Sequence, residues 1–201
     1  MKSLTLGSGT GLVIVAHPDD ETIWMGGTIL SSPQVKWTIF SLCRCDDTDR
    51  AQKYQRVCET YQAKPIITDL EDEDIMTIGE SVPEIEARLS RELKDKKFTY
   101  IFTHNTNGEY GHPRHKGVYQ AVKRMLQTKQ LTCDQLYYFS YYCDPVKNIA
   151  LPKETAATYS IQLAPETLRT KRKLIHEFYG FSRKSFEYRS CAPLETFHLL
   201  V

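Results

Sequence analysis

The sequence predicts an α/β protein whose mostly parallel sheet carries helices on both faces. Short apolar segments alternate with longer segments of helical periodicity along much of the chain. The first apolar segment, residues 12–16, has no polar interruption, which is typical of a strand buried on both faces of a parallel sheet. Because 201 residues are enough for one complete core, we expect a single domain over residues 1–201.

The glycine-rich residues 7–11 come before the first strand, whereas a phosphate-binding loop follows one. We therefore expect them to be a flexible lead-in. Residues 22–30 predict a helix in which Gly26 and Gly27 allow the backbone to approach the sheet or a ligand closely, since each glycine costs a helix about 1 kcal/mol relative to alanine. Further on, apolar segments and one-sided helical periodicity predict a strand at 35–42, a helix at 50–62 and a strand at 65–67.

The middle of the chain contains an acidic run, residues 69–74, which we expect to be a solvated loop that could also border a site. Ser81 and Glu84 have the spacing of a capping box, which predicts a helix from Ser81 to about residue 95. A strand at 99–103 follows. Pro113 is well placed as the first residue of a helix that runs through residue 126.

The last third is less informative about function. Residues 135–142 form an aromatic strand, which we interpret as core and sheet edge rather than as a platform for sugar binding. Further segments predict a strand at 159–163 and a helix at 166–179. Residues 195–200 fit either a short strand or a docking tail.

Composition excludes several classes of protein. The net charge is +1, so no basic surface indicates a nucleic-acid partner. No apolar run reaches the roughly 18 residues of a membrane-spanning helix, and the first residues lack the apolar part of a signal peptide. The six cysteines fit neither a disulfide scaffold nor a four-cysteine zinc site. We therefore expect a cytoplasmic protein with free thiols, no membrane span and no nucleic-acid partner.

A polar cluster, His17, Asp19, Asp20 and Glu21, directly follows the first strand. Open α/β sheets bind ligands at the carboxyl ends of their strands. The imidazole of His17 and the carboxylate of Asp20 are donors suited to zinc. The simpler interpretation is an acidic first turn of a helix, which the helix dipole favours.

A second polar cluster follows the strand at 99–103. If Pro113 begins a helix, His112 lies at or near its N-cap and His115 lies in its first turn. Residues three apart share a helix face, so both imidazoles can point into the same cleft as His17 and Asp20. The alternative is that they are ordinary cap or core histidines.

These residues together suit the hydrolysis of an amide. A catalytic zinc has three protein ligands and one open position for water. His17, Asp20 and one of the two later histidines supply such a set. Asp19 could then act as general base, and the other histidine could stabilise an oxyanion or protonate a leaving amine.

Residues 16–21, Ala-His-Pro-Asp-Asp-Glu, resemble the signature of the PIG-L/LmbE-like zinc-dependent de-N-acetylases, and residues 110–115 resemble that family's second motif. The resemblance implies a Rossmann-like fold and removal of acetyl from an N-acetylglucosamine-type sugar. We suggest that Glu21 supports a metal ligand. The roles that the resemblance implies are metal binding by His17, Asp20 and His115, general base for Asp19, acid or oxyanion partner for His112, and substrate binding for Arg50 and Tyr110.

One position departs from the family pattern. Arg114 stands where the family usually has an aspartate, and a nearby cation disfavours a protonated His112. Arg114 could bind a carboxylate or phosphate group of the substrate, or it could be a solvent-exposed helix residue.

Several alternatives stay open. A site of two histidines and one aspartate accepts Zn²⁺ but also iron, cobalt or manganese. The expected partner is a small N-acetylated amino sugar or glycoconjugate, and a homo-oligomer is compatible with the sequence. Alternative functions are a metal-dependent hydratase of an unsaturated carboxylic acid, which Arg114 would suit, and a non-enzymatic sugar- or metal-binding module, which would not require a base at Asp19.

Overall fold

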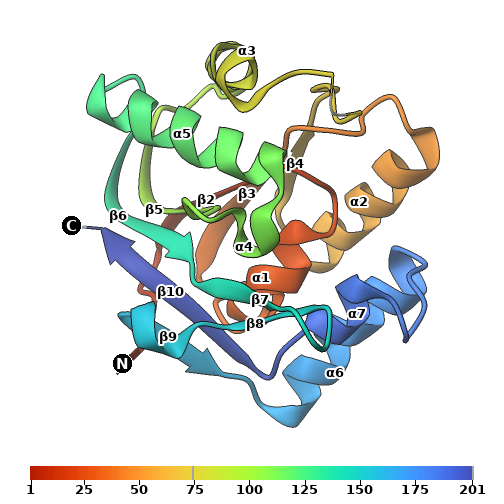
Figure 1. The fold of residues 1–201 in the computed structure, drawn as a ribbon. Helices are drawn as coiled ribbons and strands as arrows, with labels where there is room; N and C mark the ends of the chain where they lie inside the picture. The colour runs from red at the N-terminus through yellow and green to blue at the C-terminus, as the bar shows by residue number, and fades with distance from the viewer. Residues whose placement is uncertain (74, 201) are drawn as a thin grey trace.

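The computed structural model describes residues 1–73 and 75–200 and confirms the predicted α/β class. Its centre is an eight-stranded sheet with the strand order β1-β9-β10-β6-β5-β2-β3-β4 (Figure 1). The central strand is β2, Gly9–Val15, which pairs in parallel with β3 and β5, and the parallel part continues to β4 and β6. The bounds of these neighbours are Val35–Ser41 for β3, Lys64–Ile67 for β4, Lys97–Thr103 for β5 and Thr132–Phe139 for β6.

The alternation of side chains along β2 places a core on each face of the sheet. Leu12 and Ile14 pack with α3, Ile78–Glu92, and α5, Pro113–Gln127. On the opposite face Val13 and Val15 pack with the other helices, so β2 is buried on both sides, as its sequence predicts (Figure 1). The helices of that second face are α1, Asp20–Leu30, α2, Thr48–Thr60, and α6, Pro165–Lys173, which continues as a π-helical turn at Leu174–Phe178.

The C-terminal part extends the sheet with an antiparallel strand. β10, Leu194–Leu200, lies antiparallel between β6 and β9, Tyr159–Gln162, so residues 195–200 form a strand and not a tail. The short β1, Lys2–Ser3, closes this edge in parallel with β9. Three short helices, α4, α7 and a 3₁₀ turn, lie outside the sheet at Gly108–Gly111, Phe186–Ser190 and Glu154–Ala156.

Two expectations about strands are wrong in detail. Gly9 and Gly11 lie inside β2 rather than in a flexible lead-in, because Gly11 packs under Trp37: a Cβ added there would lie 2.4 Å from the indole ring. The aromatic strand expected at 135–142 is divided at Ser140. Its second part, β7, Tyr141–Asp144, leaves the sheet and pairs with β8, Ile149–Pro152, in a separate hairpin.

The expected capping box at Ser81 is also wrong. The N-cap of α3 is Thr77, whose side chain accepts a hydrogen bond from Glu80 N, while Glu80 accepts one from Thr77 N at 2.8 Å. Ser81 lies inside the helix and donates to Ile78 O. The same spacing of hydroxyl and carboxylate thus occurs one helical turn earlier, where it also starts the helix.

Among the helices of residues 1–73 and 75–200, none combines the length and apolarity needed to cross a bilayer.

The buried carboxylate of Glu195 on β10 binds α6 through an ion pair and α1 through backbone hydrogen bonds. Lys171 Nζ donates to Glu195 Oε1 at 2.7 Å, and both side chains are fully buried. The Glu195 carboxylate also accepts hydrogen bonds from the backbone N–H groups of Gly27 and Thr28, each at 2.8 Å. Gly27 has no room for a side chain, since an added Cβ would lie 2.3 Å from Leu163, which confirms the close backbone approach expected there.

We predict that Glu195→Ala lowers the free energy of unfolding by about 3–5 kcal/mol, because it leaves the Lys171 ammonium buried without a counter-charge. Glu166→Ala, which removes a mostly exposed carboxylate from α6, is the control and is expected to change stability by no more than about 0.5 kcal/mol. Urea unfolding followed by circular dichroism measures both. Equal stabilities of the two variants would contradict the role given to Glu195.

Candidate metal centre

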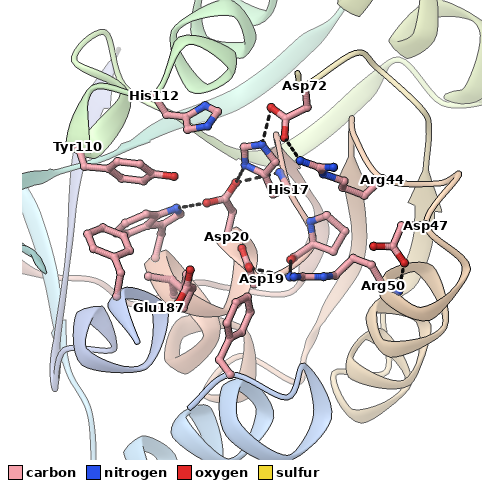
Figure 2. A pocket seen from close by; sticks show the side chains of 15 residues that line it. His17, Asp19, Asp20, Arg44, Asp47, Arg50, Asp72, Tyr110, His112 and Glu187 are labelled. Atoms are coloured by element: carbon pink, nitrogen blue, oxygen red, sulfur yellow. Dashed lines mark hydrogen bonds and ion pairs between the residues drawn. The ribbon is translucent and has the colours of Figure 1, made fainter. Parts of the chain in front are cut away.

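A pocket of about 340 Å³ opens at the carboxyl ends of β2, β3 and β5 (Figure 2). His17 follows β2, Arg44 follows β3, and Tyr110 and His112 follow β5. Parallel strands end at the same edge of the sheet, so segments far apart in the sequence meet there, as expected for an open α/β sheet.

Three donor atoms form a nearly regular triangle at the edge of this pocket, which His17 and Asp20 line and behind which His115 is buried. His17 Nδ1 lies 3.2 Å from Asp20 Oδ2, His115 Nε2 lies 3.3 Å from the same oxygen, and the two nitrogens are 3.4 Å apart. A tetrahedral zinc with bonds of about 2.0–2.1 Å needs ligand atoms about 3.3–3.4 Å from one another. His17, Asp20 and His115 therefore fit one face of a coordination tetrahedron, and His112 lies beside them, its ring centroid 4.7 Å from that of His17.

In His17 and His115, the ring nitrogen that points away from the triangle lies next to a carboxylate. Asp72 Oδ1 lies 3.0 Å from His17 Nε2, and Glu109 Oε2 lies 2.6 Å from His115 Nδ1. The hydrogen bond to Glu109 fixes the His115 ring and leaves its Nε2 free to bind a metal, whereas the contact of Asp72 with His17 is an ion pair without hydrogen-bond alignment. Asp72 comes from the acidic run, where the sequence allowed a contribution to a site without indicating which residue makes it. Residue 74, which ends that run, lies outside the described residues.

His104 and Glu109 are buried members of the site that the sequence analysis did not identify. Ala16 N donates to His104 Nε2 at 3.0 Å, which assigns the ring proton to Nδ1, and Nδ1 faces Glu109 Oε2 at 2.6 Å. The His104 ring stacks on that of His115 with centroids 3.8 Å apart. Glu109 thus holds two imidazoles with one oxygen, and it does so with an unusual backbone φ of 55°. Glu109 lies in the same loop as three histidines, and this was the one sequence feature that could have indicated its role.

Asp19 has a strained backbone. Its φ is 125°, a conformation that L-residues rarely adopt, and Glu21 Oε2 stabilises it by accepting from Asp19 N at 3.0 Å. The fully buried Glu21 also accepts from Tyr179 OH at 2.8 Å. Glu21 thus supports the backbone of Asp19 and does not contact a candidate metal ligand through its side chain, contrary to our suggestion.

The Asp19 carboxylate faces the pocket, where Arg50 Nη1 donates to its Oδ2 at 3.0 Å (Figure 2). Burial and the neighbouring Asp20 carboxylate raise the pKa of Asp19 well above its usual value, and the charge of Arg50 opposes that shift. Arg50 in turn lies over the Phe181 ring, with 4.8 Å between guanidinium carbon and ring centroid.

His112 occupies the N-cap of α5, as the sequence predicts. Its Nδ1 accepts from Arg114 N at 3.2 Å, so in the neutral ring the proton is on Nε2. Burial and the imidazoles of His115 and His17 lower the pKa of His112 to about 4. At neutral pH His112 therefore offers a hydrogen-bond donor and not a positive charge.

Arg114 fits neither of the two interpretations given to it. The side chain is only 1% exposed and does not line the pocket. Its Nη2 donates to Glu71 Oε2 at 2.8 Å and to Met76 O at 2.6 Å. Arg114 is therefore not positioned to bind a substrate anion, and it is not a solvent-exposed helix residue.

The remaining wall of the pocket is aromatic. The Tyr110 ring packs against those of His115 and Phe186, and Figure 2 shows its hydroxyl directed into the pocket. Phe181, Phe186 and Glu187 come from the segment around α7. The sequence analysis did not identify these three residues, because that segment lies more than 160 residues from His17 and contains no polar motif.

The chain is similar to several known proteins in sequence and in fold. The model of a family described as GlcNAc-PI de-N-acetylase (PIG-L) matches residues 12–126. An uncharacterized protein, L374, of Acanthamoeba polyphaga mimivirus is 24% identical over 170 residues, which cover 75% of this chain and 71% of that protein.

Two solved structures share the fold. The N,N'-diacetylchitobiose deacetylase from Pyrococcus horikoshii is 15% identical, with a TM-score of 0.65 and coverage of 95% of this chain and 83% of that one. The 4-carboxy-2-hydroxymuconate hydratase GalB from Pseudomonas putida is 14% identical, with a TM-score of 0.63 and coverage of 94% of each chain. At these identities the likeness concerns the fold alone.

We predict that Asp19→Gly is more stable than Asp19→Ala by about 1 kcal/mol or more, because glycine adopts a φ of 125° without strain. At Gln55, an exposed residue inside α2, the order is expected to reverse, with the glycine variant about 1 kcal/mol less stable than the alanine variant. Thermal unfolding of the four variants compares the two positions. The same order at both would show that Asp19 carries no strain.

Proposed function

Because the chain belongs to the GlcNAc-PI de-N-acetylase (PIG-L) family, we propose that it is a metal-dependent hydrolase that removes the acetyl group from an N-acetylglucosamine-type amino sugar or its conjugate. One observation carries the proposal. The triangle of His17, Asp20 and His115 lies beside the strained carboxylate of Asp19, in a pocket large enough for one sugar unit.

The metal would be held by His17 Nδ1, Asp20 Oδ2 and His115 Nε2. Two imidazoles and one carboxylate favour zinc, and another divalent transition metal is compatible with them. When bound, such an ion makes water a better nucleophile at neutral pH and polarises the amide carbonyl. The Glu109 carboxylate holds the His115 ring in the tautomer that this binding would require, and the Asp72 carboxylate lies 3.0 Å from His17 Nε2, where its charge favours the corresponding tautomer of His17.

Asp19 is the proposed general base. Arg50 donates to its Oδ2, and the carboxylate faces the pocket, where it could accept a proton from a water that attacks the amide. The Arg50 charge opposes the rise in the pKa of Asp19 and so favours the ionised form that can accept a proton. The strained backbone at Asp19 directs this carboxylate toward the pocket beside the three donor atoms. A relaxed backbone would direct it elsewhere.

His112 and Tyr110 are the proposed partners of the substrate carbonyl oxygen. Neutral His112 presents an Nε2–H donor, and burial together with nearby carboxylates keeps the pKa of Tyr110 far above neutrality, so that its hydroxyl remains a donor. Two neutral donors stabilise a developing oxyanion without a change of protonation. We therefore assign His112 as an oxyanion partner in preference to a general acid.

A hydratase of an unsaturated acid has less support. The two arginines of the pocket already have carboxylate partners, Arg50 with Asp19 and Arg44 with Asp72 and Glu73. Arg114, which would have suited an acidic substrate, is buried elsewhere. A non-enzymatic binding module also has less support, because binding alone does not require a strained carboxylate at Asp19.

We predict that Asp19→Asn keeps its bound metal but lowers kcat for acetate release at least about 100-fold, because the amide cannot accept a proton. Acetate is measured with N-acetylglucosamine, its β-glycosides, N,N'-diacetylchitobiose and the GlcNAc-inositol headgroup. Asp49→Asn, on the exposed first turn of α2, is the matched control and should retain full activity. Turnover by Asp19→Asn at the wild-type rate would refute the assignment of the base.

We also predict that His115→Ala loses bound zinc, with at least about 10-fold weaker affinity in competition with a chromophoric chelator, and loses acetate release with it. His198→Ala removes a histidine from β10, outside the pocket, and should behave as wild type. Wild-type protein that binds no divalent metal, or that binds metal and releases no acetate from any of these compounds, would contradict the proposed function.

A further inference from the structure

We propose that Asp72 is a positioning residue for His17, and that Arg114 holds the loop that carries Asp72. The proposal rests on the proposed function to the extent that His17 binds a metal. It gives a role to two residues that the catalytic assignments leave unused: one from the acidic run before α3, and one buried arginine at the start of α5.

Asp72 lies against His17 in a buried ion-pair contact, which is defined by distance and not by a hydrogen bond, since neither His17 Nε2 nor Asp72 Oδ1 has a hydrogen-bond partner among the described residues. Asp72 Oδ1 lies 3.0 Å from His17 Nε2, on the side of the ring opposite to Nδ1, which faces Asp20 and His115 (Figure 2). The Asp72 side chain is only 8% exposed. The negative charge of a carboxylate at this distance favours a proton on Nε2, which would leave the lone pair of Nδ1 for the metal.

Arg44 steadies Asp72 from the other side. Arg44 Nη2 donates to Asp72 Oδ2 at 2.8 Å, and Arg44 Nη1 donates to Glu73 Oε1 at 3.0 Å. The guanidinium occupies the oxygen of Asp72 that does not face His17. Asp72 thus faces His17 with one oxygen and accepts from Arg44 with the other, while the side-chain carboxylate of Glu73, next to it in the sequence, pairs with Arg44.

Arg114 fixes the same loop from α5. Its Nη2 donates to Glu71 Oε2 and to Met76 O, one on either side of Asp72 in the sequence. Glu71 closes the loop on itself, since its carboxylate accepts from the backbone N–H groups of Glu73, Ile75 and Met76. Arg114 therefore binds the residue that organises the loop, one position before Asp72.

The start of α5 then controls both imidazoles of the metal triangle. His115 lies in it directly, and His17 is reached through Arg114, Glu71 and Asp72. The loop and the start of α5 are joined by the charged hydrogen bond from Arg114 to Glu71. Both side chains are mostly removed from water, and a charged hydrogen bond is stronger there than at the surface. A substitution at Arg114 should consequently change the orientation of the His17 ring, although the contact between the two residues is indirect.

The first test measures zinc affinity of the full chain by competition with a chromophoric chelator. Asp72→Ala should bind zinc about 10–100-fold more weakly than wild type, and Asp72→Asn, which keeps an oxygen but not the charge, should lie between them. Glu73→Gln is the matched control, because it removes the neighbouring Arg44 contact alone and should bind as wild type. Asp72→Ala within threefold of Glu73→Gln would overturn the proposal.

A spectroscopic signature separates positioning from a general loss of structure. The visible absorption of bound Co²⁺ reports the ligand geometry, so Asp72→Ala should change the band shape at saturating cobalt, while Glu73→Gln should not. Unfolding of the metal-free proteins should be similar for the two variants. An unchanged cobalt spectrum in Asp72→Ala would show that His17 needs no support from Asp72.

The second test addresses Arg114. Arg114→Met and Glu71→Gln should both weaken zinc binding in the same direction as Asp72→Ala, and either one combined with Asp72→Ala should add less than its separate effect. If Arg114→Met does not fold, Glu71→Gln decides, because its side chain is partly exposed. Full additivity would show that the two residues do not act through Asp72.

Metal stoichiometry covers the remaining case. A nitrogen of His17, the thiol of Cys43 and an oxygen of Asp72 also lie within 4.8 Å of one another. A second equivalent of zinc that is lost in Cys43→Ser would make Asp72 a ligand and overturn its positioning role. Wild-type protein without bound metal would overturn both this inference and the proposed function, whereas metal binding without acetate release would overturn the proposed function alone.

Discussion

The Asp20 carboxylate is the point on which the site depends. Its Oδ2 accepts from His17 N at 2.9 Å and lies within 3.5 Å of nitrogens of His17, His104 and His115. Its Oδ1 accepts from Trp24 Nε1 at 2.8 Å. Although burial opposes ionisation, the imidazoles around this group hold the pKa of Asp20 well below its usual value, so a negative charge is fixed at the start of α1. The two polar loops meet around that charge.

Holding such a charge requires a rigid surrounding, and the fold supplies it from both faces. β2 is fully buried from Leu12 to Val15 and ends two residues before His17, so the strand fixes the position of His17 at the pocket. On one side Glu195 and Lys171 anchor α1, and on the other Glu109 and His104 join α5 to the backbone of Ala16. The unusual backbone angles of Asp19 and Glu109 persist because these contacts outweigh their strain.

Residues that act through their neighbours in sequence were predictable, and those that act through distant partners were not. The strand–loop–helix order placed His17, Asp20, His112 and His115 at one edge of the sheet, because buried apolar strands and a proline at the helix start are local signals. Arg114 was misread because its partner Glu71 lies 43 positions away. Asp72 was hidden in an acidic run whose members look alike, and only the path of the loop distinguishes it from Glu73.

The balance of charge in the pocket suits the proposed combination of a bound cation and an uncharged substrate. Five carboxylates line it, those of Asp19, Asp20, Asp47, Asp72 and Glu187, against the two guanidinium groups of Arg44 and Arg50. A divalent cation at the triangle brings this sum close to zero, whereas a substrate carboxylate would meet an excess of negative charge. Within the described part of the chain, Glu187 has no ion-pair partner, and it lines the pocket together with Phe186. A carboxylate next to an aromatic ring accepts hydrogen bonds from sugar hydroxyls, and it also tolerates the ammonium group that deacetylation leaves behind. The charge distribution therefore favours a neutral amide that becomes a cationic amine, which is the change that the proposed reaction produces.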